Sequence, residues 1–347
     1  MTNLLDFAPY SGDHERQMLA ESCALAHHHL SGCAEFARMW PDWSEATALD
    51  ELPYVHVGVF KHVKLLTDDE TVTHGRILES SSTSGVASQI TLDERSSVLQ
   101  ARSSRAILAD FVGQNMRPLL VLDSAQSLRR RGQVSARIAA AMSLQPFSSE
   151  THFILEDASD PESVRWDNVG DLLEDHHELL VYGFTWILWL AWGDALLPAS
   201  IRTQLQGKKI QFVHSGGWKK LEEIKVDRAQ FDTSLCTGLS NESSVIDYYG
   251  LVEQVGIVYP LCEFGFRHVP SWAGVVVRDS HTLEPVIGKV GQLQLINLLA
   301  YGSPYFSVLT EDLGRQVPGE CACQRSGQRF ELIGRLPKAE VRGCANV

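Results

Sequence analysis

A run of hydroxyl residues that ends in a glycine is the first stretch whose side chains suit chemistry on phosphate. Small residues let backbone N–H groups close around phosphate oxygens, and serine and threonine hydroxyls add donors. No lysine follows the glycine, so the stretch is not the G-x-x-x-x-G-K-[ST] loop. It suits either a phosphate-binding loop or a solvated Ser/Gly linker. The residues are Ser80, Ser81, Ser82, Thr83, Ser84 and Gly85, followed by Val86, Ala87 and Ser88.

Two further stretches combine glycine with aromatic and acidic residues. Gly216 and Gly217 lie in His-Ser-Gly-Gly-Trp-Lys, which ends at Lys219. Two residues without side chains let a flat ligand lie against the backbone, although the same pair suits a plain turn. In Tyr-Gly-Leu-Val-Glu, Tyr249 can stack on a nucleobase, and Glu253 four residues later can hold Mg²⁺ beside phosphates. The alternative for Glu253 is a solvated surface acid.

Two later stretches carry single charged side chains at turns. Residues 309–314, Leu-Thr-Glu-Asp-Leu-Gly, predict an acidic turn after a strand. Asp312 in this turn can accept hydrogen bonds from ribose hydroxyls, as acidic residues do in other nucleotide folds. In residues 330–338, Arg335 can contact phosphate or ribose. Each pattern is weak alone, but their order and spacing together indicate a nucleotide site.

Four soft ligands form a candidate metal site. Cys262 and His268 lie in one short segment, and Cys321 and Cys323 form a C-x-C pair. Three thiolates and an imidazole make a closed tetrahedral zinc set, which is structural rather than catalytic. The alternative is a group of buried thiols without metal.

The elements that must position these residues are strands and helices in alternation. Short, continuous apolar strands between helices are typical of a sheet that helices cover on both faces. After about residue 270 the pattern changes to strands separated by turns, which predicts a small β-rich subdomain. A long helix is expected over residues 14–39 and an extended segment over 52–61. The other expected helices are 93–115, 136–144 and 164–175, and the expected strands are 76–79, 119–122, 152–155, 179–184, 210–214, 272–277, 291–297, 306–310 and 330–334.

The composition bounds the class of protein. The chain has 347 residues, of which 44% are hydrophobic, and a formal net charge of −13. An acidic surface argues against nucleic acid and anionic membranes as partners. The sequence has no run of eighteen apolar residues, so no membrane span is expected. Without a secretory signal, seven cysteines indicate reduced thiols and a cytoplasmic location.

The motif order resembles that of adenylate-forming enzymes. Within that superfamily the chain resembles the LuxE-type acyl-protein synthetases, which are long-chain fatty acid–protein ligases of bacterial luminescence operons, and more distantly the phenylacetate–CoA ligases. The resemblance extends from about Leu52 to Cys344. Its most specific pieces are Phe60-Lys61, residues 216–219, residues 249–256, residues 310–314 and residues 340–344.

The resemblance implies an α/β fold, the N-terminal domain of an adenylate-forming enzyme, with mixed sheets covered by helices and a small β-rich subdomain. The mobile C-terminal domain is expected to be almost absent, because the chain stops at Val347. The expected parts are an N-terminal helical segment (1–50), an α/β adenylation core (51–270), the β-rich subdomain (271–335) and a short C-terminal arm (336–347).

The implied reaction is ATP- and Mg²⁺-dependent activation of a carboxylic acid, with a fatty acid as the expected substrate. Lys219 and Lys338 are candidate cations for the α-phosphate, and residues 184–192 are either an acyl-pocket wall or a buried core helix. The resemblance implies that residues 81–85 hold the β- and γ-phosphates. It also implies that Gly216 and Gly217 flank adenine and that Tyr249, beside Gly250, stacks on adenine. By the same resemblance, Glu253 binds Mg²⁺, Asp312 binds ribose, and Arg335 binds ribose or the α-phosphate.

Cys344 matches the family's acyl-accepting cysteine near the C-terminus. A thiolate is a good acyl acceptor, although an unreactive tail cysteine is the alternative. The acyl group would then pass to a partner protein such as a reductase. A second hypothesis sends it directly to CoA, a carrier protein or an amine. A third, a degenerate adenylate-binding protein, is disfavoured because Glu253, Asp312 and Arg335 are intact. Phenylacetate–CoA ligase-like relatives imply the same zinc set.

Overall fold

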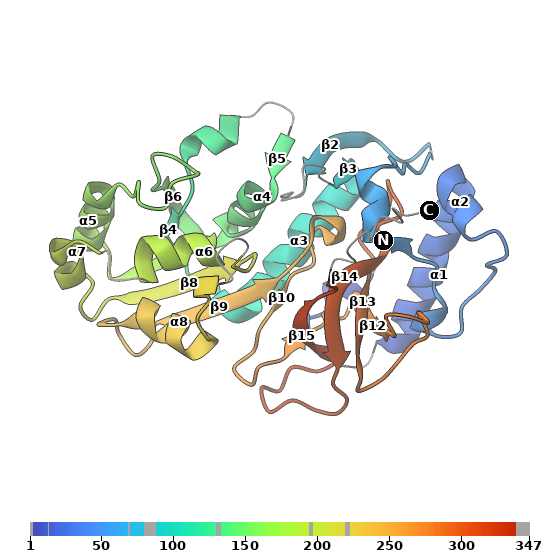
Figure 1. The fold of residues 1–347 in the computed structure, drawn as a ribbon. Coiled ribbons are helices and arrows are strands. Elements are labelled where there is room, and N and C mark those ends of the chain that lie inside the picture. Colours follow the sequence, from blue (N-terminus) through green and yellow to red (C-terminus); the bar gives the residue numbers. More distant parts are fainter. Residues whose placement is uncertain are drawn as a thin grey trace, which may run out of the picture.

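The computed structural model describes residues 3–12, 14–68, 70–79, 88–129, 133–193, 197–218 and 223–337. Within these ranges the strands form three sheets, and a long helix, α3, runs between the two larger ones (Figure 1). Among the helices described, none combines the length and the apolar character that crossing a membrane requires.

Among the described residues, the largest cluster of buried apolar side chains packs on the central sheet. Its strands follow the order β10-β9-β8-β7-β4-β6, parallel except for β10. Leu119–Val121 and Leu179–Val181 are at most 1% exposed, because helices cover both faces of these strands. The bounds are β4 Arg117–Val121, β6 Ser148–Phe153, β7 Glu178–Phe184, β8 Lys209–Ser215, β9 Ser244–Tyr249 and β10 Tyr259–Pro260, with α4 Ala136–Ser143, α5 Trp166–Asp175, α7 Ala199–Gln204 and α8 Arg228–Cys236.

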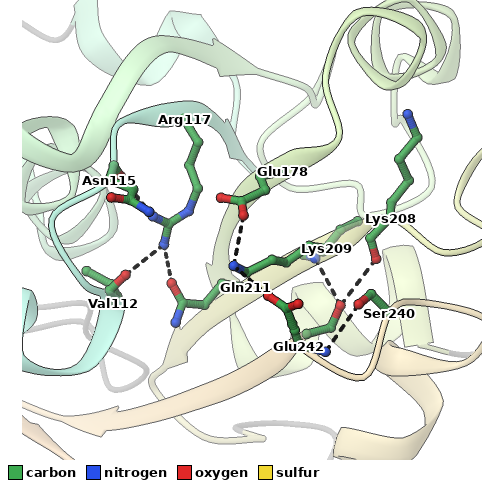
Figure 2. Close-up of polar contacts among 11 residues, drawn as sticks. Val112, Asn115, Arg117, Glu178, Lys208, Lys209, Gln211, Ser240 and Glu242 are labelled. Atoms are coloured by element: carbon green, nitrogen blue, oxygen red, sulfur yellow. Dashed lines mark hydrogen bonds and ion pairs between the residues drawn. The ribbon is translucent and has the colours of Figure 1, made fainter.

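A polar network closes the amino-terminal edge of this sheet (Figure 2). The Arg117 guanidinium donates to the carbonyls of Val112, at 3.0 Å, and Asn115, at 2.8 Å, and to the Gln211 side chain. Lys209 Nζ lies 2.8 Å from Glu178 Oε1 and 3.0 Å from Glu242. These contacts join the first residues of parallel strands, so they lie at the edge opposite the carboxyl ends of the strands.

The second sheet has the order β11-β15-β14-β13-β12, antiparallel throughout, with β1 pairing parallel to β14. The N-terminal helices pack on it through Leu25, Phe36 and Phe306, which share one buried cluster. The bounds are β1 Val55–His56, β11 Arg267–His268, β12 Ala273–Arg278, β13 Val290–Asn297, β14 Ser307–Gln316, β15 Arg329–Arg335, η1 Asn3–Asp6, α1 Glu15–Gly32, α2 Ala34–Met39 and η2 Leu49–Glu51.

Helix α3 (Glu94–Val112) belongs to both cores. Leu108 and Val112 pack into the central-sheet core, whereas Leu99 and Ile107 pack into the core of the second sheet. The helix begins at Asp93, whose carboxylate accepts from the Ser96 N–H at 2.9 Å. The remaining elements are β2 His74–Glu79, β3 Gln89–Asp93 and β5 Gln133–Ser135 in the third sheet, with η3 Val57–Lys61, η4 Ala125–Arg129, η5 Gln145–Phe147 and η8 Val252–Gln254.

The predicted α/β fold is confirmed, but several local predictions were wrong. The expected acidic turn at 310–314 lies inside β14, because β13 and β15 supply backbone partners on both sides there. The helix expected over 14–39 breaks at Cys33. For residues 184–192, by contrast, the alternative of a buried helix is confirmed. A short helix, α6 (Thr185–Leu188), continues as a π-helix, η6 (Trp189–Gly193), and Ile187, Leu188 and Trp192 are at most 2% exposed.

Part of the segment expected to be extended, 52–61, is also different. After the two residues of β1 it forms the 3₁₀-helix η3. Val57 and Phe60 are three residues apart and both buried, which suits a helix with three residues per turn. The His56 side chain caps this turn by accepting from the Gly58 N–H at 3.1 Å.

Candidate active site

A large cleft opens at the carboxyl ends of β7, β8 and β9. Its volume is about 2210 Å³, and its other walls come from η3, α3, α4, β14 and β15. The carboxyl edge of a parallel sheet is where α/β folds bind ligands, because loops with free backbone groups gather there. The cleft therefore collects residues from both large sheets.

The predicted glycine turn follows β8 at the cleft edge. Gly216 has φ of +86° and Gly217 has φ of +63°, a left-handed backbone that favours glycine. A Cβ on Gly216 would meet the Phe184 ring at 3.4 Å, whereas one on Gly217 would meet no atom within 4 Å. Both glycines line the cleft, so one packs against its wall and the other leaves the backbone open to a ligand.

Three predicted nucleotide-binding residues meet although they come from different strands. Tyr249 at the end of β9 donates its hydroxyl to Asp312 Oδ2 at 2.7 Å. Asp312 on β14 pairs in register with Arg335 on β15, whose Nε lies 3.5 Å from Asp312 Oδ1. Burial raises the pKa of Asp312, and burial also holds the pKa of Tyr249 well above its usual value. Gly250 lines the cleft beside Tyr249.

Glu253 is a buried carboxylate in the wall of the same cleft. It lies in η8 and is 4% exposed, so it is not the solvated surface acid of the alternative prediction. Burial raises its pKa, while a hydrogen bond with Ser88 and the charge of Lys61 act in the opposite direction. The next residue, Gln254, fixes the turn by donating to the carbonyls of Leu295 and Tyr305, each at 3.1 Å.

Some predicted residues lie outside the described ranges. The contact between Ser88 and Glu253 still shows that the chain resumes beside this carboxylate after the hydroxyl-rich stretch. The predicted residues that fall in the gaps are Ser81, Ser82, Thr83, Ser84, Gly85, Lys219, Lys338 and Cys344.

A polar pair that sequence reasoning missed lies in the aromatic wall of the cleft. His214 Nδ1 is 2.9 Å from Thr185 Oγ1, which also donates to the Ser215 carbonyl at 3.1 Å. Burial lowers the pKa of His214 to about 4, so the ring is neutral at pH 7. Its ring lies 4.8 Å from that of Phe231, which also packs against Trp218. No spacing rule joins Thr185 to His214; only the parallel pairing of β7 with β8 does.

The four predicted metal ligands also come together, and none of the four lines the cleft. The ligand atoms of Cys262, His268, Cys321 and Cys323 all lie within 4.8 Å of one another. Cys262 Sγ and Cys321 Sγ are 4.0 Å apart, and Cys323 Sγ is 3.1 Å from His268 Nε2. Pairing of β11 with β15 places the two halves of the site next to each other.

The fold is that of the adenylate-forming ligases. A 2-hydroxyisobutyryl-CoA ligase in an open conformation superposes with a TM-score of 0.63 at 14% identity, covering 92% of this chain and 74% of the other. The same ligase in its thioesterification state gives a TM-score of 0.64 at 13% identity, over 95% of this chain and 70% of the other. These identities establish the fold alone.

The chain belongs to the family described as acyl-protein synthetase, LuxE, which matches residues 25–347. A long-chain-fatty-acid–luciferin-component ligase of Vibrio harveyi is 26% identical over 307 residues, 86% of this chain and 77% of the relative. A ligase of the same name from Aliivibrio fischeri is 28% identical over 142 residues, 40% of this chain and 37% of the relative. The protein is an ATP-dependent acyl-adenylate-forming ligase, as the motif order predicted.

Proposed function

We propose that this ligase activates a fatty acid in the cleft and transfers the acyl group to the thiol of Cys344. The observation that carries the proposal is the convergence of Tyr249, Asp312, Arg335 and Glu253 in one cleft. The relatives' names supply the substrate class, because both are long-chain-fatty-acid ligases.

In the first step a carboxylate oxygen attacks the α-phosphorus of ATP. The bond from that phosphorus to the bridging oxygen breaks, and pyrophosphate leaves with the electron pair. Asp312 accepts from the ribose hydroxyls, and Arg335 binds ribose or the α-phosphate. Gly216 and Gly217 let adenine approach the backbone, with the Tyr249 ring against it. The protein's contribution is orientation and charge stabilisation rather than covalent chemistry.

Glu253 is the proposed Mg²⁺ ligand. A carboxylate that is 4% exposed is costly to bury unless a cation compensates its charge. Carboxylate oxygens are the ligands Mg²⁺ prefers, and it usually binds through one or two of them together with substrate phosphates. Bound there, the ion would neutralise phosphate charge. Gln254 fixes the turn that carries Glu253, and Glu253 in turn sets the position of the ion.

In the second step the Cys344 thiolate attacks the acyl carbonyl, a thioester forms, and AMP leaves. The thioester then passes its acyl group to an acceptor protein. The family description, acyl-protein synthetase, supports a protein thiol as the acceptor.

The cluster of Cys262, His268, Cys321 and Cys323 is proposed to hold a structural zinc ion. In a tetrahedral site with Zn–S bonds of about 2.3 Å, two sulfurs lie roughly 3.8 Å apart, and the Cys262–Cys321 pair is at 4.0 Å. The four donors leave no open coordination position for substrate. The ion would tie the segment before β11 to the segment before β15.

Covalent labelling tests the proposed transfer. Wild-type protein incubated with ATP and a radiolabelled C12–C16 fatty acid should retain label after denaturation, and hydroxylamine should release it. Cys344→Ala should lose the label but keep acid-dependent ATP–pyrophosphate exchange. Cys236→Ala, which changes a half-buried cysteine in α8, should keep both and serves as the control. Label that persists in Cys344→Ala would remove this cysteine as acceptor and favour direct transfer to CoA, a carrier protein or an amine.

A further inference from the structure

The described part of the cleft is lined by five basic residues, and four of them already have partners. Arg228 pairs with Asp232 at 3.2 Å, Arg267 with Asp247 at 2.6 Å, and Arg335 with Glu311 and Asp312 at 3.5 Å. Lys225 has a partner as well. The fifth is Lys61, which has no ion-pair partner among the described residues.

A rigid turn holds Lys61 in the cleft wall. It is the last residue of η3, whose Val57 and Phe60 are 7% and 3% exposed and pack in the cluster that contains Val308. The strand before it, β1, pairs with Val308 and Leu309 of β14. Lys61 thus follows directly on a strand that pairs with β14, the strand that also carries Asp312.

The charge of Lys61 acts on the proposed magnesium ligand. Lys61 and Glu253 line the same cleft, and the charge of Lys61 opposes the rise that burial imposes on the pKa of Glu253. Ser88, where the chain resumes after the hydroxyl-rich stretch, lines the cleft and hydrogen-bonds to Glu253. Lys61 therefore adds a positive charge to the cleft in which ATP phosphates are expected under the proposed function.

We propose that the Lys61 ammonium contacts the triphosphate of ATP and stabilises the charge that develops as pyrophosphate leaves the α-phosphorus. This inference rests on the proposed function and deepens it, because it gives the departing β- and γ-phosphates a cation among the described residues, whereas Lys219 and Lys338 stay the candidates for the α-phosphate. Lysine suits the role as a compact point charge for phosphate. No proton moves to or from Lys61 in the step.

The test compares Lys61→Met, Lys61→Arg and Lys64→Met. Methionine keeps the alkyl stem and removes the charge, and Lys64 is an exposed residue on the same segment that does not line the cleft. Calorimetry gives the dissociation constants of MgATP and AMP, and ATP–pyrophosphate exchange gives the rate. Thermal melting checks that each variant is folded.

Lys61→Met should weaken ATP binding about tenfold, leave AMP binding within twofold of wild type, and slow exchange about 10²-fold, the usual effect of removing one group that stabilises transition-state charge. Lys61→Arg should recover part of both losses, and Lys64→Met should match wild type. Lys61→Met with ATP binding and exchange within twofold of wild type would overturn the inference, and so would an equal loss of AMP binding. If wild-type protein binds ATP but catalyses no ATP–pyrophosphate exchange with any carboxylic acid, the proposed function is refuted. The comparison of ATP binding with AMP binding still decides the role of Lys61 in that case.

Discussion

The hydrogen bond between Tyr249 and Asp312 shows how single residues of this site are prepared for a ligand. The carboxylate is oriented by a hydroxyl at 2.7 Å and leaves its second oxygen near Arg335. The tyrosine ring in turn packs against Tyr259, with centroids 6.0 Å apart. The residue proposed to bind ribose is thus held in place before the nucleotide arrives, which reduces the entropy lost on binding.

Asp312→Asn tests the proposed ribose contact. Loss of the carboxylate charge removes a strong acceptor, so ATP and AMP should both bind about tenfold more weakly, since both contain the ribose. Isothermal calorimetry measures both constants, and Glu320→Gln, which changes an exposed residue that does not line the cleft, is the control. This pattern differs from that expected for Lys61, where only ATP is affected. Unchanged AMP binding in Asp312→Asn would contradict a ribose contact.

His214 should make the fold sensitive to acid. Its folded-state pKa of about 4 lies below the unfolded value of 6.5, so the unfolded chain binds the proton first as the pH falls. Stability is therefore full above pH 6.5 and is lost between pH 6.5 and pH 4. Between pH 7 and pH 5 the loss from His214 is about 2 kcal/mol.

Urea denaturation of wild type and His214→Gln at pH 7 and pH 5 measures this term. Burial, which removes water from the ring, is the main cause of the lowered pKa of His214, and the nearby charges are Asp247, Arg267 and Arg228. The variant should lose less stability than wild type over the same pH interval. Equal losses in both proteins would mean that His214 does not titrate in this range. His29, whose pKa burial lowers to about 3, adds its own acid sensitivity to both proteins.

At the scale of elements, strands buried on both faces were the most predictable parts. Continuous apolar runs such as Leu179–Phe184 match β7 closely because tertiary contacts agree with local pattern. The secondary-structure predictions were wrong where contacts with neighbouring strands override the local sequence pattern. Glycine and acidic residues predicted a turn at 310–314, but ladder partners on both sides keep that segment in β14. The apolar spacing of Val57 and Phe60 was compatible with η3 but too short to distinguish it from a strand.

The zinc site gives a prediction about the junction of β11 with β15. Elemental analysis of native protein should find about one zinc per chain, a ratio expected for three thiolates and one imidazole. The double variant Cys321→Ser, Cys323→Ser should lose the metal, and its melting temperature should be lower than that of wild type by ~5 °C or more. Cys236→Ser is the control and should keep both. Full zinc content in the double variant, or none in the native protein, would contradict the site.

At the scale of the whole molecule, α3 joins two apolar cores, and the cleft lies between the sheets that those cores support. The motif order was enough to predict the superfamily, and with it the α/β fold. Sequence could not show that Lys61 shares a cleft wall with Glu253, because no motif spacing links residues so far apart. The same holds for Thr185 with His214, whose contact depends on strand pairing.

Acid-dependent exchange of radiolabelled pyrophosphate into ATP tests the central claim most directly, namely that this cleft forms an acyl-adenylate. Wild-type protein should catalyse exchange with at least one straight-chain fatty acid in a C4–C16 panel, and only in the presence of Mg²⁺. Glu253→Gln should exchange about 10²-fold more slowly with its fold intact. Exchange that no acid supports in wild type, or a wild-type rate in Glu253→Gln, would contradict the account.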